Sequence, residues 1–115
     1  LPAIISPRAY VSPRASLGAG TIVMHGAIVN AGVVIGKNCI INSSSLVEHG
    51  VHISDHVHVS TGSRVNGDVR IGSGSFVGSG AILKEGITIG EACLIGMGLS
   101  IRQDIASGQK VTTSK

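Results

Sequence analysis

The sequence predicts an all-β protein in which very short parallel strands wind into a β-helix. Three observations support this prediction. Every sixth residue from Ile5 to Ile101 is Ile, Leu or Val. Glycines recur at a second fixed position of the same six-residue repeat. The apolar residues are Ile and Val more than Leu, and strands favour β-branched side chains. Strands that turn every six residues are typical of a coil in which each strand stacks on the one a full turn earlier.

The other positions of the repeat agree with this reading. Four residues after the aliphatic position the side chain is mostly small or β-branched, as at Ala27, Val51 and Ser75. This position lies two residues before the next aliphatic one, so both point to the same side of a strand and into a narrow interior. Three residues after the aliphatic position there is usually a glycine, and Asn38 and Asp68 also occupy this place. These residue types predict a turn with positive φ.

Composition argues against several classes of function. The net charge of +3 comes from nine basic and six acidic residues without a basic run, so we expect no nucleic-acid binding. One Tyr, one Phe and no Trp leave little surface for stacking on bases. No segment approaches the roughly 20 apolar residues that cross a bilayer, and no signal peptide is visible. We therefore expect a cytoplasmic protein whose domain does not contact a membrane.

The repeat of one aliphatic, one small, two variable, one small and one variable residue resembles the hexapeptide-repeat acyltransferases over residues 4–105. The resemblance implies a left-handed, triangular parallel β-helix of about six coils, in which three repeats make each 18-residue coil. We expect the acyltransferase β-helix over residues 1–105 and a polar tail over residues 106–115. Cys39 and Cys93 would then lie three coils apart, roughly 14 Å, which is too far for a disulfide and suits a reducing compartment.

The residue before each aliphatic position points outward, and the 18-residue coil sorts these residues into three faces. Face A holds Ile4, Ile22, Ile40, His58, Phe76 and Leu94; face B holds Tyr10, Ile28, Leu46, Arg64, Ile82 and Ser100; face C holds Ser16, Val34, His52, Arg70 and Thr88. Exposed apolar stripes such as faces A and B mark an interface. Face A of one copy against face B of the next closes a ring of three, so we predict a homotrimer. The alternative is that a neighbouring domain covers these faces.

Histidine is the candidate for the chemistry, because four of the five histidines lie between residues 49 and 58. His49 is at a turn, where the side chain projects from a rigid corner, and an imidazole that titrates near neutrality suits a general base. The corner of His49 joins faces B and C, whereas His58 lies on face A. In the trimer, His49 of one chain and His58 of the next should share one groove. Neither the histidine spacing nor a Cys–His cluster indicates a metal site.

The segments 41–49 (INSSSLVEH), 58–62 (HVSTG) and 66–67 (NG) resemble one branch of the family. That branch contains sialic-acid O-acetyltransferases and bacterial UDP-4-amino-sugar N-acetyltransferases. The resemblance implies that His49 is the base and that His58 of the neighbouring chain contacts acetyl-CoA. It also implies that Asn42 holds the sugar and that the Gly67 amide meets the thioester carbonyl, where it would stabilise an oxyanion. Spacing alone adds the backbone of Ser79 and Met97 as contacts of the pantetheine arm.

This sequence departs from the branch at two places. Members often carry Asp or Glu directly after the base, where this chain has Gly50. Glu48 is our candidate for the missing orienting carboxylate, with Asp55 as a second. Members also begin with a nucleotide-sugar-binding domain of Rossmann type, which this sequence does not contain. We expect that domain upstream in the natural protein.

The resulting hypothesis is acetyl transfer from acetyl-CoA to an amino or hydroxyl group of a bacterial sugar, such as a UDP-sugar, in glycan biosynthesis. Two alternatives stay open at the level of sequence. One is acetyl transfer to another small acceptor such as serine. The other is a non-catalytic trimerisation module, which Gly50 and the missing N-terminal domain favour.

Overall fold

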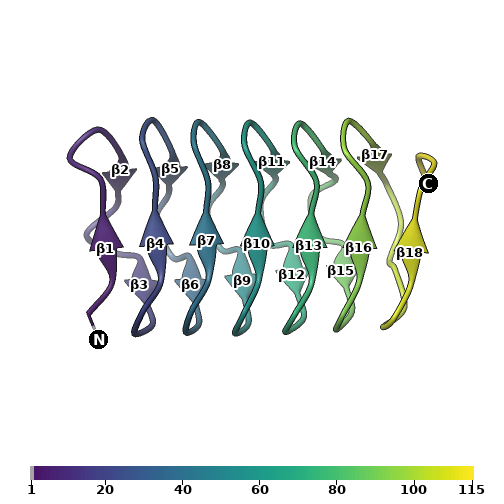
Figure 1. Cartoon of the computed structure of the whole chain (residues 1–115), viewed down its shortest axis with the longest axis horizontal. Coiled ribbons are helices and arrows are strands. Elements are labelled where there is room, and N and C mark those ends of the chain that lie inside the picture. The colour runs from purple at the N-terminus through teal and green to yellow at the C-terminus, as the bar shows by residue number, and fades with distance from the viewer. Residues whose placement is uncertain (1) are drawn as a thin grey trace.

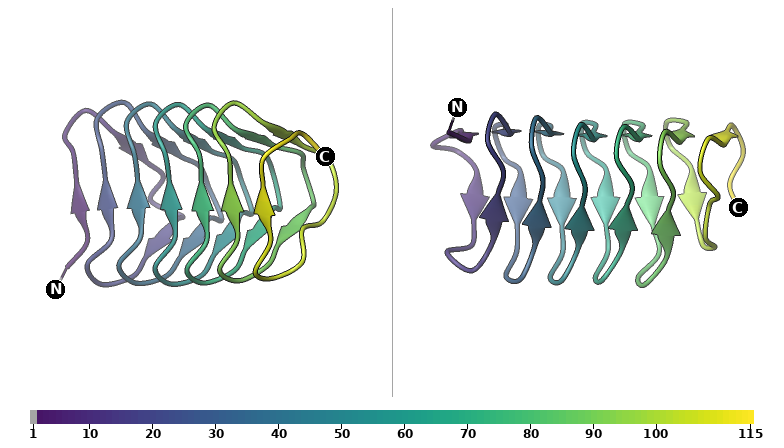
Figure 2. Two further views of the ribbon diagram at one scale, coloured as in Figure 1. Left: turned by 45° about the vertical axis from the view of Figure 1, so that its right-hand side comes forward. Right: turned by 90° about the horizontal axis from the view of Figure 1, so that it is seen from below.

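The computed structural model describes residues 2–115 as one stack of short parallel strands (Figure 1). The described residues form 18 strands of two residues each and no helix. From β1 to β17 the strands alternate with four-residue turns, as the six-residue repeat predicts. The two termini lie at opposite ends of the long axis (Figures 1 and 2), which measures 34 Å.

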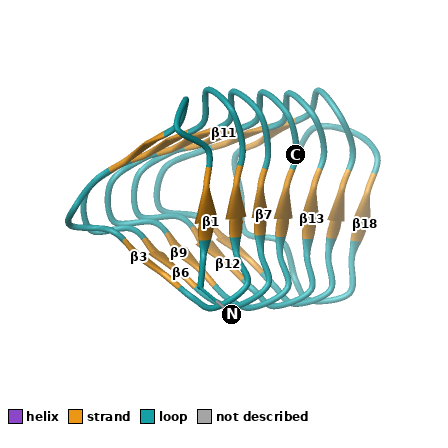
Figure 3. Cartoon of the chain, turned by 60° about the vertical axis from the view of Figure 1, so that its left-hand side comes forward, coloured by secondary structure: helices purple, strands orange, loops and turns teal. Residues whose placement is uncertain are grey.

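The strands form three parallel sheets, one for each predicted face. Sheet A contains β1 (Ile4–Ile5), β4 (Ile22–Val23), β7 (Ile40–Ile41), β10 (His58–Val59), β13 (Phe76–Val77), β16 (Leu94–Ile95) and β18 (Lys110–Val111). Sheet B contains β2 (Tyr10–Val11), β5 (Ile28–Val29), β8 (Leu46–Val47), β11 (Arg64–Val65), β14 (Ile82–Leu83) and β17 (Ser100–Ile101). Sheet C contains β3 (Ser16–Leu17), β6 (Val34–Ile35), β9 (His52–Ile53), β12 (Arg70–Ile71) and β15 (Thr88–Ile89). Figure 3 shows the sheets as the three sides of a prism.

The register confirms the 18-residue coil. Ile4 pairs with Ile22, His58 pairs with Phe76, and Ile82 pairs with Ser100. The chain rises through β1 at the front of Figure 1, crosses the top to β2 at the back and advances from left to right. This path is a left-handed coil. Its hand is opposite to the usual crossover between parallel strands, as the family resemblance implies.

The core consists of the two inward positions of the repeat. Side chains at the aliphatic position, such as Val29, Ile53 and Leu83, are completely buried. Small residues at the second inward position, such as Ala27 and Ala81, are buried beside them. Cys39 and Cys93 also lie in this core and are free thiols, as expected. Burial of one Val, Ile or Leu side chain contributes about 1.5–3 kcal/mol, so the continuous aliphatic column is the main source of stability.

The turns adopt the positive φ that the glycine pattern predicts. Gly50 has φ of +72° and Asp68, one coil later, has φ of +60°. Ser44, His56 and Ala92 take the same conformation at equivalent positions, although such residues rarely adopt it. The winding of the coil therefore dictates the backbone at this position, whatever the side chain.

The C-terminal residues differ from the expected polar tail. Lys110–Val111 form β18, which pairs with β16 in sheet A, and Val111 is buried. Ile95 pairs with Val111 and Ile89 with Ile105, so the last coil is two residues shorter than the regular coils. Because this shorter coil breaks the six-residue pattern, the repeat alone does not reveal β18. The described residues contain no helix long and apolar enough to cross a membrane.

Candidate functional site

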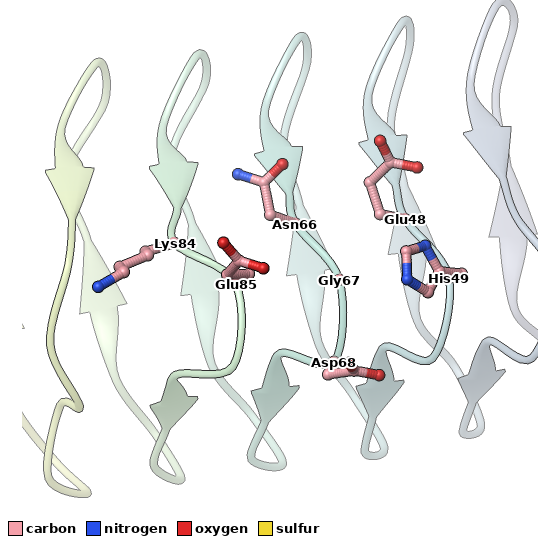
Figure 4. Close-up of a pocket in the computed structure, with 7 residues that line it drawn as sticks. All are labelled: Glu48, His49, Asn66, Gly67, Asp68, Lys84 and Glu85. Atoms are coloured by element: carbon pink, nitrogen blue, oxygen red, sulfur yellow. The ribbon is translucent and has the colours of Figure 1, made fainter.

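A cavity of about 420 Å³ lies on the corner between sheets B and C, hereafter the B/C corner, at the turns that follow β8, β11 and β14. Figure 4 shows its residues on three successive coils. They are Glu48, His49, Asn66, Gly67, Asp68, Lys84 and Glu85. The corner thus brings together three residues predicted for the site, Glu48, His49 and Gly67.

His49 and Gly67 fit against each other across one coil. The His49 side chain is exposed and stands next to the Gly67 turn (Figure 4). A Cβ atom added to Gly67 would lie 3.3 Å from both Cε1 and Nε2 of His49. Contacts this short are tighter than ordinary packing, so glycine gives the imidazole its place at this corner.

The backbone amide of Gly67 has no hydrogen-bond acceptor among residues 2–115. It therefore has a free N–H group a few ångströms from the His49 ring. A free amide beside a basic ring can donate to a carbonyl oxygen that gains negative charge while the ring accepts a proton. This pair of groups is suited to acyl transfer.

Glu48 does not hold the His49 ring in this structure. Its Oε1 atom accepts a hydrogen bond of 2.6 Å from Nδ2 of Asn30, one coil earlier. No hydrogen bond within residues 2–115 joins Glu48 to His49. Asp55, the second candidate carboxylate, lies on the corner between sheets C and A and accepts a hydrogen bond of 2.8 Å from the Lys37 amide. The group that orients His49 must be sought elsewhere.

Asn42 and His58 form a second group, at the edge of sheet A. Oδ1 of Asn42 accepts a hydrogen bond of 2.8 Å from the Ser43 amide, which leaves Nδ2 to face Nε2 of His58 at 3.3 Å. The His58 ring also meets the edge of Phe76, with ring centroids 5.0 Å apart and planes at 78°. When Nδ2 of Asn42 donates, Nε2 of His58 accepts, so this contact favours the neutral ring protonated at Nδ1.

Burial reinforces the neutral state of His58. Partial burial on sheet A lowers the pKa of His58 below its ordinary value of 6.5, because desolvation disfavours the charged ring. His58 is therefore mostly uncharged at neutral pH, with one ring nitrogen that donates a hydrogen bond and one that accepts.

Ser79 and Met97 lie with Asn42 on the corner between sheets A and B, hereafter the A/B corner. Both side chains are exposed, and the Met97 side chain is 77% exposed. Their backbone amides, like that of Gly67, have no acceptor among residues 2–115. A row of free amides one coil apart suits a ligand that runs along the coil axis.

The predicted site residues thus divide between two corners of one chain. Glu48, His49 and Gly67 lie on the B/C corner, whereas Asn42, Ser79 and Met97 lie on the A/B corner, with His58 beside it on sheet A. One chain does not bring the two groups together. The sequence reasoning missed Asp68, Lys84 and Glu85, although the 18-residue period places Glu85 in the column of His49 and the other two directly beside that column.

The remaining histidines lie away from the cavity. Nδ1 of His25 is 2.5 Å from Oγ of Ser6 at the A/B corner near the N-terminus. His52 points outward on sheet C, and His56 occupies a positive-φ turn between sheets C and A. Within residues 2–115, no three His, Cys, Asp or Glu side chains are arranged as metal ligands.

Two family descriptions match separate parts of the chain. "Bacterial transferase hexapeptide (six repeats)" matches residues 14–49, and "Hexapeptide repeat of succinyl-transferase" matches residues 68–103. Comparison with curated protein sequences gives no match.

Several solved structures are highly similar to this chain. The acetyltransferase domain of PglB from Neisseria gonorrhoeae is 38% identical, with a TM-score of 0.95 over 96% of this chain and 54% of that chain, and has also been solved in complex with acetyl coenzyme A. PerB from Caulobacter crescentus, in complex with CoA and GDP-perosamine, is 35% identical, with a TM-score of 0.91 over 92% of this chain and 51% of that chain. WeeI from Acinetobacter baumannii is 25% identical, with a TM-score of 0.89 over 93% of this chain and 53% of that chain. This chain spans about half the length of each of these structures.

Proposed function

Because this chain belongs to the hexapeptide-repeat transferases of left-handed β-helix fold, we propose that it transfers an acetyl group from acetyl-CoA to an amino group of a bacterial sugar. The observation that carries the proposal is the pairing of the His49 ring with the free amide of Gly67 in the cavity of the B/C corner. The similarity to PglB and PerB supports the same reaction class.

In the proposed reaction, the sugar amine attacks the carbonyl carbon of the thioester while His49 takes the amine proton. The Gly67 amide donates a hydrogen bond to the oxyanion of the tetrahedral intermediate. The C–S bond then breaks, the carbonyl re-forms as an amide, and the CoA thiolate leaves and takes up the proton held by His49. His49 is a general base and not a nucleophile, so no acyl-enzyme forms.

Acetyl-CoA is the proposed acetyl donor, and a neighbouring cavity suits its phosphates. This cavity of about 390 Å³ shares Asn66 and Lys84 with the His49 cavity, has apolar walls at Ile82 and Ile101, and ends at Arg102. Lys84 and Arg102 are one coil apart, and cations in such an array bind phosphate oxygens. His58, Ser79 and Met97 are the proposed contacts from the neighbouring chain.

The proposed acceptor is an amino sugar carried on a nucleotide, with Asn42 as a contact. PerB, which binds GDP-perosamine, is 35% identical over 92% of this chain. The serine acetyltransferase of Neisseria gonorrhoeae is more distant, at 26% identity and a TM-score of 0.52. Sugar is therefore favoured over serine. We further propose that a nucleotide-sugar-binding domain precedes this β-helix and that the enzyme works in the cytoplasm, where buried cysteines stay reduced.

A homotrimer would complete the site. Exposed apolar side chains follow both sheets that flank the A/B corner: Phe76 (39% exposed) and Leu94 (42%) on sheet A, and Ile82 (41%) on sheet B. When sheet A of one copy meets sheet B of the next, His58 and Asn42 of one chain lie opposite His49 of its neighbour. The trimer thereby joins the two groups of site residues that one chain keeps apart.

Acetyl transfer is tested by following thiol release from acetyl-CoA with a panel of UDP- and GDP-linked amino sugars. We expect turnover with at least one sugar and its loss in His49→Asn. His52→Asn is the matched control, because His52 is an exposed histidine on the adjacent strand β9 and lies outside the cavity. Calorimetry with acetyl-CoA provides the second measurement. A folded trimer that binds no acetyl-CoA at millimolar concentration would support a non-catalytic scaffold instead.

A further inference from the structure

The B/C corner contains the carboxylate of Asp68, a residue from which the repeat pattern predicts only a turn. Asp68 has φ of +60°, a conformation that glycine adopts without strain and that Asp adopts less readily. Gly32, Gly50 and Gly86 occupy the same position in the neighbouring coils, with positive φ in each case. Asp68 therefore places a charged side chain at a corner position that the neighbouring coils fill with glycine.

The Asp68 carboxylate occupies the space above Gly50. A Cβ atom added to Gly50 would clash with Oδ1 of Asp68, well inside any real contact distance. A side chain at position 50 and the present conformation of Asp68 therefore exclude each other. The residue directly after His49 is Gly50. The space that a side chain at position 50 would fill is occupied by the Asp68 carboxylate of the next coil.

Asp68 is also tied to His49 itself. The Asp68 amide donates a hydrogen bond of 3.1 Å to the carbonyl oxygen of His49, and both residues line the same cavity. Figure 4 shows the Asp68 side chain pointing toward the coil of His49. The backbone of Asp68 thus fixes its carboxylate relative to the histidine.

The Asp68 carboxylate is free to act, unlike two other aspartates of the chain. Asp55 and Asp104 accept hydrogen bonds of 2.8 and 2.9 Å from the amides of Lys37 and Thr88. No hydrogen bond from residues 2–115 holds the Asp68 carboxylate. Glu48, the other acid beside His49, is bound by Asn30. The remaining charged groups of the cavity are Lys84 and Glu85, on the coil beyond Gly67.

We propose that Asp68 is the positioning carboxylate of His49, which it orients and stabilises in the protonated form, in place of an acidic residue at position 50. The proposal rests on the proposed function, in which His49 is the base. A carboxylate near the ring favours the imidazolium that forms when His49 takes the proton of the sugar amine. One coil supplies the base and the next supplies its counter-ion.

The test compares Asp68→Asn, which keeps the size and turn preference of Asp68, with the parent in two measurements. Nuclear magnetic resonance with ¹⁵N-labelled histidine follows the titration of the His49 ring without any substrate. We expect the midpoint to lie lower in Asp68→Asn than in the parent, because a neighbouring carboxylate favours the charged ring. The transfer rate should fall about tenfold, with the acid limb of its pH profile moved to lower pH.

Two further variants separate this role from a structural one. Gly50→Asp combined with Asp68→Gly moves the carboxylate to the coil of His49 and should restore the midpoint and most of the rate. Asn38→Gly is the matched control, because Asn38 leans over Gly20 as Asp68 leans over Gly50, with Oδ1 against the place of a Cβ atom on Gly20. It should change neither measurement.

Equal His49 midpoints in the parent and Asp68→Asn would overturn the proposal, even if activity fell. The titration is independent of catalysis, so it decides the role of Asp68 separately from the reaction. If the His49 midpoints of the parent and Asp68→Asn differ but the parent acetylates no sugar, the proposed function is refuted while the pairing of Asp68 with His49 stands.

Discussion

The Cα atom of Gly67 lies so close to the His49 ring that a single methyl group on it would stand 3.3 Å from Nε2. The contact couples the proposed base to the proposed oxyanion donor, since the Gly67 turn both carries the amide and packs against the His49 ring. Gly67 does not have positive φ, so its backbone alone does not require glycine. The requirement comes from the imidazole.

We therefore expect Gly67→Ala to displace the His49 ring and lower the rate of acetyl transfer by roughly ten- to a hundredfold, the usual cost of a small misplacement in an active site. The free energy of unfolding should change by less than about 1 kcal/mol, because the turn is at the surface. Steady-state kinetics and thermal unfolding measure the two effects. A rate equal to that of the parent would mean that the contact has no part in catalysis.

His58 should make stability depend on pH. Its pKa in the folded chain is lowered by burial from the ordinary value of 6.5. Between the folded value and 6.5 the unfolded chain binds more protons than the folded chain, so stability falls as the pH drops through this window. The melting temperature should be constant above about pH 7 and fall below pH 6.5.

His58→Gln removes the titrating ring and should flatten this part of the melting curve against pH. His52→Gln is the control, because His52 is exposed at the equivalent outward position of the preceding strand, β9, and should leave the slope unchanged. Identical slopes in the parent and His58→Gln would show that protonation elsewhere in the chain limits stability at acid pH.

Lys84 and Arg102 should hold the phosphates of acetyl-CoA. Each forms part of the cavity that continues from His49 toward the C-terminus. Lys84→Ala and Arg102→Ala should each weaken acetyl-CoA binding about five- to tenfold, near 1 kcal/mol for a solvent-exposed charge pair, and less at high salt. Calorimetry at two salt concentrations measures this. Lys37 lies on the corner between sheets C and A, outside this cavity. The Lys37→Ala variant should therefore bind acetyl-CoA as tightly as the parent.

Most of the fold followed from one column of the sequence. Every sixth residue from Ile5 to Ile101 is aliphatic. A column of aliphatic side chains with this period is buried when the chain winds into a coil and the column faces its interior. Val111 was missed because the last coil is two residues shorter than the others, which moves Val111 out of this column. The pattern describes regular coils and is uninformative where the period changes.

The candidate site was predictable only in part. His49 was identifiable as a histidine that projects from a turn, the face pattern placed His58 of the next chain in the same groove, and the resemblance added Gly67. Asp68 was not, because a positive-φ turn explains an aspartate without reference to chemistry. Whether its carboxylate lies over Gly50 depends on the direction of the Asp68 side chain, which the sequence does not specify. The engagement of Glu48 by Asn30 likewise depends on rotamers that a sequence does not specify.

Mixed trimers provide the most direct test of a site that is shared between chains. His49→Ala and His58→Ala should each form inactive or nearly inactive trimers, because every site needs both histidines. The two proteins are then unfolded and refolded together at equal concentration. Where a His58→Ala chain supplies His49 and the neighbouring His49→Ala chain supplies His58, the site between them contains both histidines again. For random assembly in a closed ring, roughly one quarter of the sites should recover.

Recovery is measured as the rate of acetyl transfer relative to the parent protein treated in the same way. Refolding each variant alone is the control and should restore no activity. If His49 and His58 acted within one chain, every site of the mixed trimer would lack one of them, and mixing would give no gain. Partial recovery near a quarter therefore requires both a trimer and a site built from the B/C corner of one chain and sheet A of its neighbour.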